Sequence, residues 1–425
     1  MAIRTLKTID GYASETSVFP GEQIVFHIRN ETWLSRIDIF RKGQQDELVL
    51  SDLIIETDSK VASLPKDAPS AGCGWPSAYT LTIPPDWKSG VYVARLSTYN
   101  ASNEVLFVVK SRTPASRVLF SVTSTTAQAY NPWGGKSLYD GIPLNASAST
   151  KVSFNRPGGL DDFYWWEYDF LKWLEVNGIA ADFCTSIDLD RDPALLGAYR
   201  LLLSVGHDEY WSKAMRDNVE AFRDRGGNIA FFSGNDCYWQ IRFEDDYRTI
   251  VCYKDAAADP VKDQTATVNW HADPVNRPGA ELMGVDFRKG GGYWSTRHDK
   301  KLDPVGFTVI RADHWVFENT NLKNGDTFGA DSYVLSNETD STGAGTPANF
   351  VVLAEATLSN MPEWPVQPDW PGKATMGIYQ KEGNGGNRGI VFTASTDNWS
   401  LGLLVKPDSA VRQITLNVLK RLASD

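Results

Sequence analysis

Cysteine is scarce in this chain. Only Cys73, Cys184, Cys237 and Cys252 occur among 425 residues, and no two of them form a CxxC pair. Neither their number nor their spacing fits a disulfide-stabilised scaffold or a zinc knuckle. We therefore expect four buried free thiols.

Excess basic charge and long apolar runs are also lacking. The formal net charge is -11 and lysine and arginine form no run, which argues against nucleic acid and anionic lipid as partners. No stretch of about 18 apolar residues occurs, and residues 1–22 lack the apolar segment of a signal peptide. We expect a soluble, cytoplasmic protein that binds neither a membrane nor nucleic acid.

The hydrophobic pattern divides the chain into two parts. Up to about residue 110, short alternating segments such as QIVFHI and RIDIF are separated by Pro-Gly, Lys-Gly and Pro-Pro turns. About seven such strands in about 100 residues are typical of an immunoglobulin-like β-sandwich. We place this sandwich at residues 1–112 and a second, α/β domain at residues 113–425.

The second domain alternates strands with helices, which predicts βαβ units and a mostly parallel sheet. From about residue 252 to 350 the rhythm is broken by Gly, Pro, Trp and Asp clusters, so we interpret this part as an irregular β-rich insertion. The expected elements are strands at residues 117–123, 180–184, 199–205, 228–233 and 388–394, helices at residues 163–177 and 212–225, and a helix at the C-terminus.

The most informative stretch is HDEYW, which lies between the buried-strand pattern LLLSVG and the helix pattern that follows. Parallel strands end on the same side of a sheet, so the loops after three of the expected strands should meet at one edge. The side chains that would meet there include those of Tyr130, His207, Glu209 and Asn235.

Structural roles remain open for the residues of this region. A histidine at a strand end is often a hydrogen-bonded core group. For Asp208, a role as the N-cap of the following helix is favoured over a catalytic role. From spacing alone, His314 and Glu338 are expected at surface or packing positions. Cys237 follows a strand, as the nucleophile of a strand-to-helix elbow would, but no G-x-C-x-G surrounds it, so a thiol nucleophile is not favoured.

Several longer motifs carry a family resemblance. Taken in order, they resemble the large, catalytic subunit of N,N-dimethylformamidase and the wider family that shares its C-terminal region. The resemblance covers nearly the whole chain and implies an immunoglobulin-like domain followed by a glutamine-amidotransferase-like α/β domain. The motifs are PGE at residues 20–22, DWKSGVYVARL at 86–96, AYNPWGGKSLY at 129–139, VSFNRP at 152–157, HDEYWS at 207–212, SGNDCYW at 233–239, HWVFENTNLKNGD at 314–326 and STDNWSLGL at 395–403.

The resemblance further implies a mononuclear non-haem iron centre in which two tyrosines and one glutamate hold the metal, as Fe³⁺. Matched residue by residue, these ligands fall on Tyr92, Tyr130 and Glu209. His207 then lies against the site, and Glu338 takes the place of the family's proposed catalytic glutamate. Phenolate and carboxylate oxygens are hard anionic donors that suit trivalent iron. The residues that complete the expected pocket are Asn131, Trp133, Asn235 and His314.

The leading hypothesis is an iron-dependent hydrolase that cleaves the C–N bond of a small amide. The metal would act as Lewis acid and water activator, while His207 or Glu338 moves protons. Two alternatives stay open: a non-catalytic binding or scaffold protein that keeps the fold, and a metal-free amidotransferase-like enzyme that uses Cys237. Whether the protein forms a homo-oligomer is left open. A separate small subunit is also left open, although nothing in the chain indicates one. Because the chain is much shorter than the family's large subunit, the formamide substrate does not carry over with the resemblance.

Overall fold

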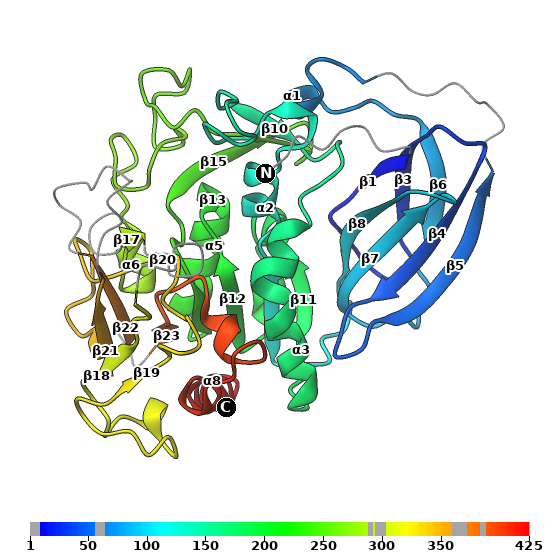
Figure 1. Ribbon diagram of the computed structural model, residues 1–425. Coiled ribbons are helices and arrows are strands. Elements are labelled where there is room, and N and C mark those ends of the chain that lie inside the picture. The colour runs from blue at the N-terminus through cyan, green and yellow to red at the C-terminus, as the bar shows by residue number, and fades with distance from the viewer. Residues whose placement is uncertain are drawn as a thin grey trace.

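The computed structural model describes residues 9–55, 64–287, 292–293, 303–358, 372–382 and 388–424. Helices make up 21% and strands 33% of the structure, so the fold is mixed and rich in sheet. A β-sandwich, blue in Figure 1, lies beside a larger sheet that is flanked by helices.

The N-terminal part consists of two packed sheets with a common apolar core. One has the strand order β1-β3-β6 and the other the order β2-β8-β7-β4-β5. Over most of β3 buried residues alternate with less buried ones, and Ile24, Phe26 and Ile28 all point into the core. The predicted two-layer β-structure is confirmed, while its immunoglobulin-like type stays a prediction. The elements are β1 Ile9–Ala13, β2 Ser17–Val18, β3 Gln23–Asn30, β4 Leu34–Arg41, β5 Glu47–Ile55, α1 Ala68–Ala71, β6 Ser77–Thr82, β7 Gly90–Ser97 and β8 Ser102–Val109.

The second part is built around a nine-stranded sheet with the order β11-β9-β12-β14-β23-β22-β21-β18-β19. Its first five strands are parallel, and all five were predicted within a few residues: β9 Val118–Val122, β11 Asp182–Thr185, β12 Leu201–His207, β14 Asn228–Gly234 and β23 Ile390–Thr393. The first of them in the chain, β9, lies between the second and the third. The chain therefore passes from β9 to a strand on one side and from β12 to a strand on the other side. Open α/β sheets bind ligands at the point where the direction of the connections changes.

The other four strands of this sheet pair antiparallel, so the predicted mostly parallel sheet is parallel over only half of its pairings. They are β18 Phe307–Val309, β19 Thr327–Phe328, β21 Val351–Thr357 and β22 Lys373–Gln380. β21 and β22 were not predicted from the sequence. β18 and β19 fall within the range predicted as an insertion, yet they extend the main sheet. The described residues of this range are therefore partly an edge of the sheet.

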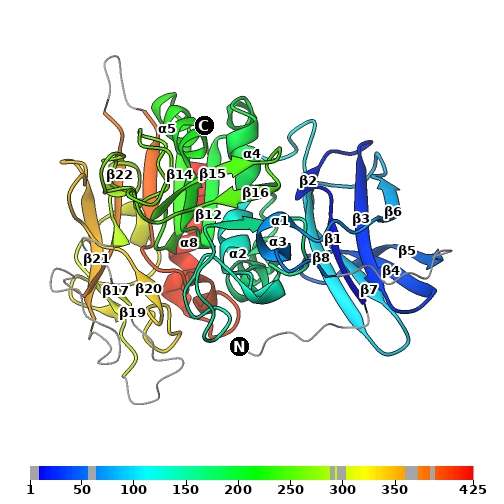
Figure 2. The ribbon, with the colours of Figure 1, turned by 90° about the horizontal axis from the view of Figure 1, so that it is seen from above.

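Helices cover both faces of the parallel strands, because these strands are apolar on both sides. Along β12, Leu201, Leu203 and Val205 contact the face that carries α3 and α8, whereas Leu202 points to the face that carries α5. Figures 1 and 2 show α5 on one side of the sheet and α3 with α8 on the other. The helices are α2 Ser124–Tyr130, the π-helix η2 Phe163–Glu167, α3 Tyr168–Val176, α4 Ser186–Arg191, α5 Lys213–Asp224 and α8 Ser409–Leu422. The helices predicted at residues 163–177 and 212–225 and at the C-terminus are confirmed.

A four-stranded sheet lies over the carboxyl edge of the parallel strands, at the top of Figure 1. It begins where β12 and β14 end, because β13 and β15 follow them directly in the chain. Its strands are β13 Tyr210–Ser212, β15 Trp239–Glu244, β16 Thr249–Val251 and β10 Lys151–Ser153. The remaining elements are η1 Trp133–Gly135, η3 Leu195–Ala198, α6 Ala280–Met283, β17 Gly292–Tyr293, η4 Trp315–Phe317, β20 Glu338–Thr339 and η5 Trp399–Gly402.

None of the helices described is both long enough and apolar enough to cross a bilayer. All four cysteines are buried and free, as expected.

Candidate functional site

The loops after β9, β12 and β14 meet at the carboxyl edge of the sheet, as predicted. Tyr130 is the last residue of α2, which follows β9, and its hydroxyl donates to Glu209 Oε2 over 2.8 Å. Asn235, just after β14, donates from Nδ2 to Glu338 Oε2 over 3.1 Å. A backbone bond ties the loops after β12 and β14 together, since Tyr238 N donates to Glu209 O over 2.9 Å.

Glu209 is the centre of the cluster. Its side chain is fully buried, and each carboxylate oxygen accepts one tyrosine hydroxyl. The Tyr130 hydroxyl donates to Oε2, and the Tyr139 hydroxyl donates to Oε1 over 3.1 Å. The two tyrosine rings stack with centroids 4.6 Å apart. Three oxygen-bearing side chains are therefore held together on one buried carboxylate, with both tyrosines partly open to solvent.

A second carboxylate, that of Glu338, lies at the same ring nitrogen of His207 as Glu209. His207 Nε2 lies 2.9 Å from Glu338 Oε2 and 3.5 Å from Glu209 Oε2. Burial alone would lower the pKa of His207, but the two carboxylates outweigh it and raise the pKa to about 10. His207 and Glu338 therefore form a charged pair beside the tyrosines, in the positions that the resemblance implied.

Burial also changes the acid–base state of the other groups. It raises the pKa of Tyr130 and Tyr139 well above the ordinary range, and the Glu209 carboxylate adds to that effect. The pKa of Glu209 is raised by the same burial. Lys254 brings a further cation close to the tyrosines, with Nζ 3.7 Å from the centroid of the Tyr139 ring. Without a further positive charge at this point, both tyrosines are held as neutral phenols.

Tyr92 is not part of this cluster. It lies in the core of the sandwich, stacked on Trp87 and on Phe107, and its hydroxyl donates to Lys88 O over 2.8 Å. The prediction that Tyr92 joins Tyr130 and Glu209 is therefore wrong. Alternation along β7 turns this side chain inward, between the two sheets, and its hydroxyl is already occupied there.

His314 also lies elsewhere. Its Nδ1 accepts from Val316 N over 3.3 Å and caps η4, which packs on α8. Its neighbour Trp315 borders a groove with Arg117 and Val118, the residues at the amino end of β9. His314 is thus near the edge opposite the cluster, so the predicted pocket role is wrong and the packing role expected from spacing is correct.

Asn131 and Trp133 support the loop beyond Tyr130 without contacting Glu209. Asn131 Nδ2 donates to Pro157 O over 2.9 Å, and its Oδ1 accepts from Trp133 N. The Trp133 ring packs edge-on against Trp75 of the sandwich, with centroids 5.8 Å apart. Both residues are buried and hold the loop that follows Tyr130.

Asp208 does not cap α5. That role belongs to Ser212, whose hydroxyl accepts from Met215 N over 3.0 Å. The Asp208 carboxylate is buried and accepts from Ser204 Oγ over 2.8 Å, and burial raises its pKa to about 6. The capping prediction fails because β13 lies between Asp208 and the helix, so the N-cap position falls on Ser212, four residues later.

Cys237 is a poor nucleophile in this structure. It is 1% exposed, and burial raises the pKa of its thiol to about 12. A thiolate is the reactive form of cysteine, so this environment works against the amidotransferase-like alternative.

Tyr139 and Lys254 were not identified from the sequence. Tyr139 ends the motif AYNPWGGKSLY, and the two glycines and the proline before it were a signal that the loop could turn back on Tyr130. Lys254 follows β16 in a stretch without a distinctive pattern, and only the pairing of β16 with β15 brings it to the site.

Within the described ranges, no three histidine, cysteine, aspartate or glutamate side chains gather in a way that could hold a metal ion. A metal bound at Glu209 would therefore need tyrosine oxygens to complete its ligand set. Tyr130 and Tyr139 are the two that already contact this carboxylate.

The strand order and this cluster define an α/β protein with a buried glutamate, two tyrosines and a histidine at the carboxyl edge of its sheet. Residues 36–411 match the family described as N,N-dimethylformamidase beta subunit-like, C-terminal. Because the match extends over most of the chain, the protein belongs to this family.

Two curated relatives are named N,N-dimethylformamidase beta subunit. The one from Alcaligenes sp is 21% identical over 435 residues, which cover 83% of this chain and 55% of the relative. The one from Paracoccus aminophilus is 23% identical over 292 residues, which cover 60% of this chain and 36% of the relative. The chain thus spans about half or less of their lengths. Among solved structures, a chimeric titin Z1Z2 functionalized with a KLER peptide from decorin matches 27% of this chain and 60% of its own, at 17% identity and a TM-score of 0.14.

Proposed function

We propose that this protein hydrolyses the C–N bond of a small amide at a mononuclear iron centre held by Tyr130, Tyr139 and Glu209. The observation that carries the proposal is that each oxygen of the buried Glu209 carboxylate accepts a hydrogen bond from a tyrosine hydroxyl. His207 and Glu338 lie directly beside this carboxylate. Tyr139 here replaces Tyr92 of the sequence-based ligand set.

The donor set fits a trivalent iron ion. Phenolate and carboxylate oxygens are hard anionic ligands, and a bound cation of high charge favours the ionised form of a tyrosine that burial alone keeps protonated. Two tyrosinates and one carboxylate would carry three negative charges, which matches Fe³⁺ in sign and number. Lys254 beside Tyr139 adds a positive charge that favours its phenolate.

When bound, the ion would supply Lewis-acid polarisation of the amide carbonyl and a water of lowered pKa. The chain's own residues supply the proton transfers. His207 Nε2 faces both carboxylates and can donate a proton to the departing amine nitrogen. Glu338 can accept the proton of the attacking water, and Asn235 Nδ2 holds its carboxylate in place. The apolar wall of Trp166, whose ring centroid lies 6.3 Å from that of His207, keeps bulk water from one side of the imidazole.

The names of the relatives support a small amide as substrate and suggest a partner chain. Both relatives are designated as a subunit, which places them in an enzyme of more than one kind of chain. We therefore propose that this protein acts in an oligomer, either with copies of itself or with a further subunit.

Three substitutions test the ligand set. Wild type, Glu209→Gln, Tyr139→Phe and Tyr92→Phe are purified, loaded with iron and compared by elemental analysis and by visible tyrosinate-to-iron absorption. We expect Glu209→Gln and Tyr139→Phe to lose iron or the absorption band while the fold is retained. Tyr92→Phe is the matched control, because it also removes a buried hydroxyl, yet one that bonds only to Lys88 O.

Activity is measured as release of amine from N,N-dimethylformamide and related small amides. A wild-type protein that takes up no iron and shows no visible absorption after loading contradicts the metal centre. Iron uptake without amine release from any small amide contradicts the hydrolase and favours the non-catalytic alternative. Loss of the band in Tyr92→Phe, with the band kept in Tyr139→Phe, would show that the sequence-based ligand set was the right one.

A further inference from the structure

Arg156 is 2% exposed, and its guanidinium is held entirely by backbone carbonyls. Within the described part of the chain, no carboxylate pairs with it, and burial lowers its pKa to about 9. The donated bonds are Nε to Ser153 O over 3.1 Å, Nη1 to Trp133 O over 2.7 Å and to Lys136 O over 2.9 Å, and Nη2 to Asn131 O over 3.1 Å and to Gln128 O over 3.3 Å.

Four of these five carbonyls belong to one segment, residues 128–139, which we call the tyrosine loop. It leaves the end of α2 at Tyr130, turns through Gly134 and Gly135, both with positive φ, and returns to Tyr139. Leu138 N donates to Ala129 O over 2.9 Å and closes the loop. In the turn, Asn131 O, Trp133 O and Lys136 O accept from the guanidinium. Gln128 O, near the end of α2, accepts from it and also from Asn131 N over 3.3 Å. One buried guanidinium therefore joins the turn to the end of the helix.

We propose that Arg156 is a positioning residue: its guanidinium fixes the tyrosine loop so that Tyr130 and Tyr139 present their hydroxyls to the two oxygens of Glu209. Five donors in a rigid planar fork suit this task, whereas the three donors of a lysine radiate from one atom. The residues after Arg156 act on the same loop, because Pro157 O accepts from Asn131 Nδ2 and Gly158 leaves room for that amide.

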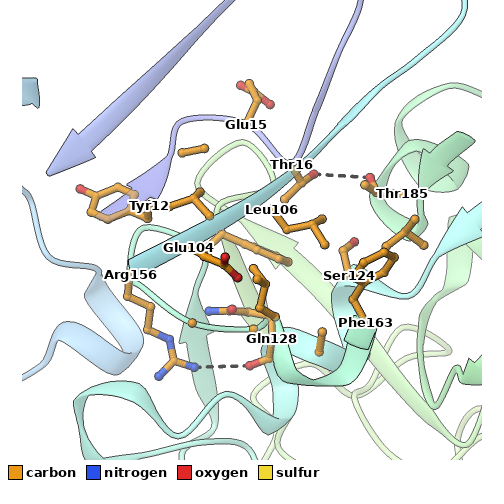
Figure 3. A pocket seen from close by; sticks show the side chains of 18 of the residues that line it. Tyr12, Glu15, Thr16, Glu104, Leu106, Ser124, Gln128, Arg156, Phe163 and Thr185 are labelled. Atoms are coloured by element: carbon orange, nitrogen blue, oxygen red, sulfur yellow. Dashed lines mark hydrogen bonds between the residues drawn. The ribbon is translucent and has the colours of Figure 1, made fainter. Parts of the chain in front are cut away.

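Arg156 borders a cavity of about 70 Å³ between the sandwich and the α/β part, which Figure 3 shows together with its bond to the Gln128 carbonyl. Removal of the side chain would enlarge this cavity. A free guanidinium ion could then occupy the place of the lost group.

Arg248 provides a matched control. It lines the same cavity, it is partly buried, and burial lowers its pKa to about 10. Its bonds go to Asn155 Oδ1 over 2.9 Å and to Ala13 O over 2.8 Å, so they do not reach the tyrosine loop. Its loss should therefore disturb the junction with the sandwich and leave the tyrosines in place.

The first test uses the metal-free proteins and does not depend on the proposed function. Hydrogen exchange is measured by mass spectrometry for wild type, Arg156→Ala, Arg156→Lys and Arg248→Ala. We expect exchange in residues 128–139 to accelerate at least about 10-fold in Arg156→Ala, less in Arg156→Lys, and not in Arg248→Ala. Addition of about 10 mM guanidinium, far below unfolding concentrations, should restore protection in Arg156→Ala.

The second test rests on the proposed function and follows iron. We expect the iron affinity of Arg156→Ala to fall about 10- to 100-fold, with a shifted tyrosinate-to-iron band, and guanidinium to restore both. Arg248→Ala should bind iron like wild type.

The inference is overturned if folded Arg156→Ala keeps wild-type protection of the tyrosine loop, or if Arg248→Ala loosens that loop equally. If Arg156→Ala does not fold, the test rests on Arg156→Lys. Wild-type hydrogen-exchange protection of the tyrosine loop in that variant would overturn the role of the planar guanidinium. Absence of iron in wild type, together with a loosened loop in Arg156→Ala, would refute the proposed function and leave the positioning role standing.

Discussion

Removal of the Asp188 carboxylate tests how the sandwich is joined to the α/β part. Asp188 lies in α4 with a side chain that is 1% exposed. Its Oδ1 accepts from Lys110 Nζ over 2.6 Å and from Ser17 Oγ over 2.7 Å, both on the sandwich. Its Oδ2 accepts from the backbone and the hydroxyl of Thr185, each over 2.8 Å, at the start of α4.

The cost of Asp188→Ala follows from these four bonds. Loss of one partner of a buried ion pair leaves the other charge buried, here Lys110 at 11% exposure, and costs about 3–5 kcal/mol. Loss of the capping interaction with Thr185 adds about 1 kcal/mol. We therefore expect the free energy of unfolding to fall by about 4–6 kcal/mol in urea titrations followed by tryptophan fluorescence.

A double-mutant cycle isolates the pair. Lys110→Met should cost much less in the Asp188→Ala background than in wild type, with a coupling energy of about 0.5–3 kcal/mol. The exposed pair Lys151–Glu244 is the control, and Glu244→Ala should cost less than about 1 kcal/mol. A cost below about 1 kcal/mol for Asp188→Ala, or no coupling with Lys110, would refute the reasoning.

Three further outcomes are expected. Gly206→Ala should destabilise the protein by several kcal/mol on urea titration, because a Cβ there would lie 2.3 Å from Trp166 Cβ at a φ of +81°, and unchanged stability would count against it. Burial alone would raise the pKa of Asp259, but bonds from Arg242 and Thr267 outweigh it and hold the pKa well below the usual range. The Asp259 carboxylate therefore stabilises the fold at pH values above its ordinary pKa, and this stabilisation is lost as pH falls through its lower pKa in the folded state. Asp259→Asn should flatten the loss of stability below about pH 4, and an unchanged acid profile contradicts this. Cys237 should react with a thiol reagent only at the rate of unfolding, whereas rapid labelling of native protein would contradict its burial.

The helices and the parallel strands could be predicted because their signals are local. Met215, Val219 and Phe222 form one stripe with helical spacing, and Gly226 and Gly227 end it, so α5 was located within a residue at each end. β21 and β22 carried no such signal. They are strands because β22 pairs with the edge of β23 and β21 pairs with β22, and that edge exists only in the assembled sheet.

The candidate site was only partly predictable for a similar reason. Tyr130, Glu209 and Asn235 were expected together because parallel strands end on one side of a sheet, a rule that needs only the order of elements. Tyr92 was assigned to the site by matching motifs, although alternation along β7 favoured the core, and the alternation was correct. Tyr139 was missed because its place depends on how a glycine-rich loop closes.

By itself, the sequence determined the periodicities, the strand ends that carry the polar side chains and the family to which the chain belongs. Each of these depends on neighbours in the chain or on the order of motifs. Tertiary structure alone decided that Tyr139 faces Glu209, that Lys254 reaches the same place, and that Arg156 holds the loop between the tyrosines. Those contacts join residues far apart in the chain, and their distances are set by packing and by buried hydrogen bonds, which no local pattern records.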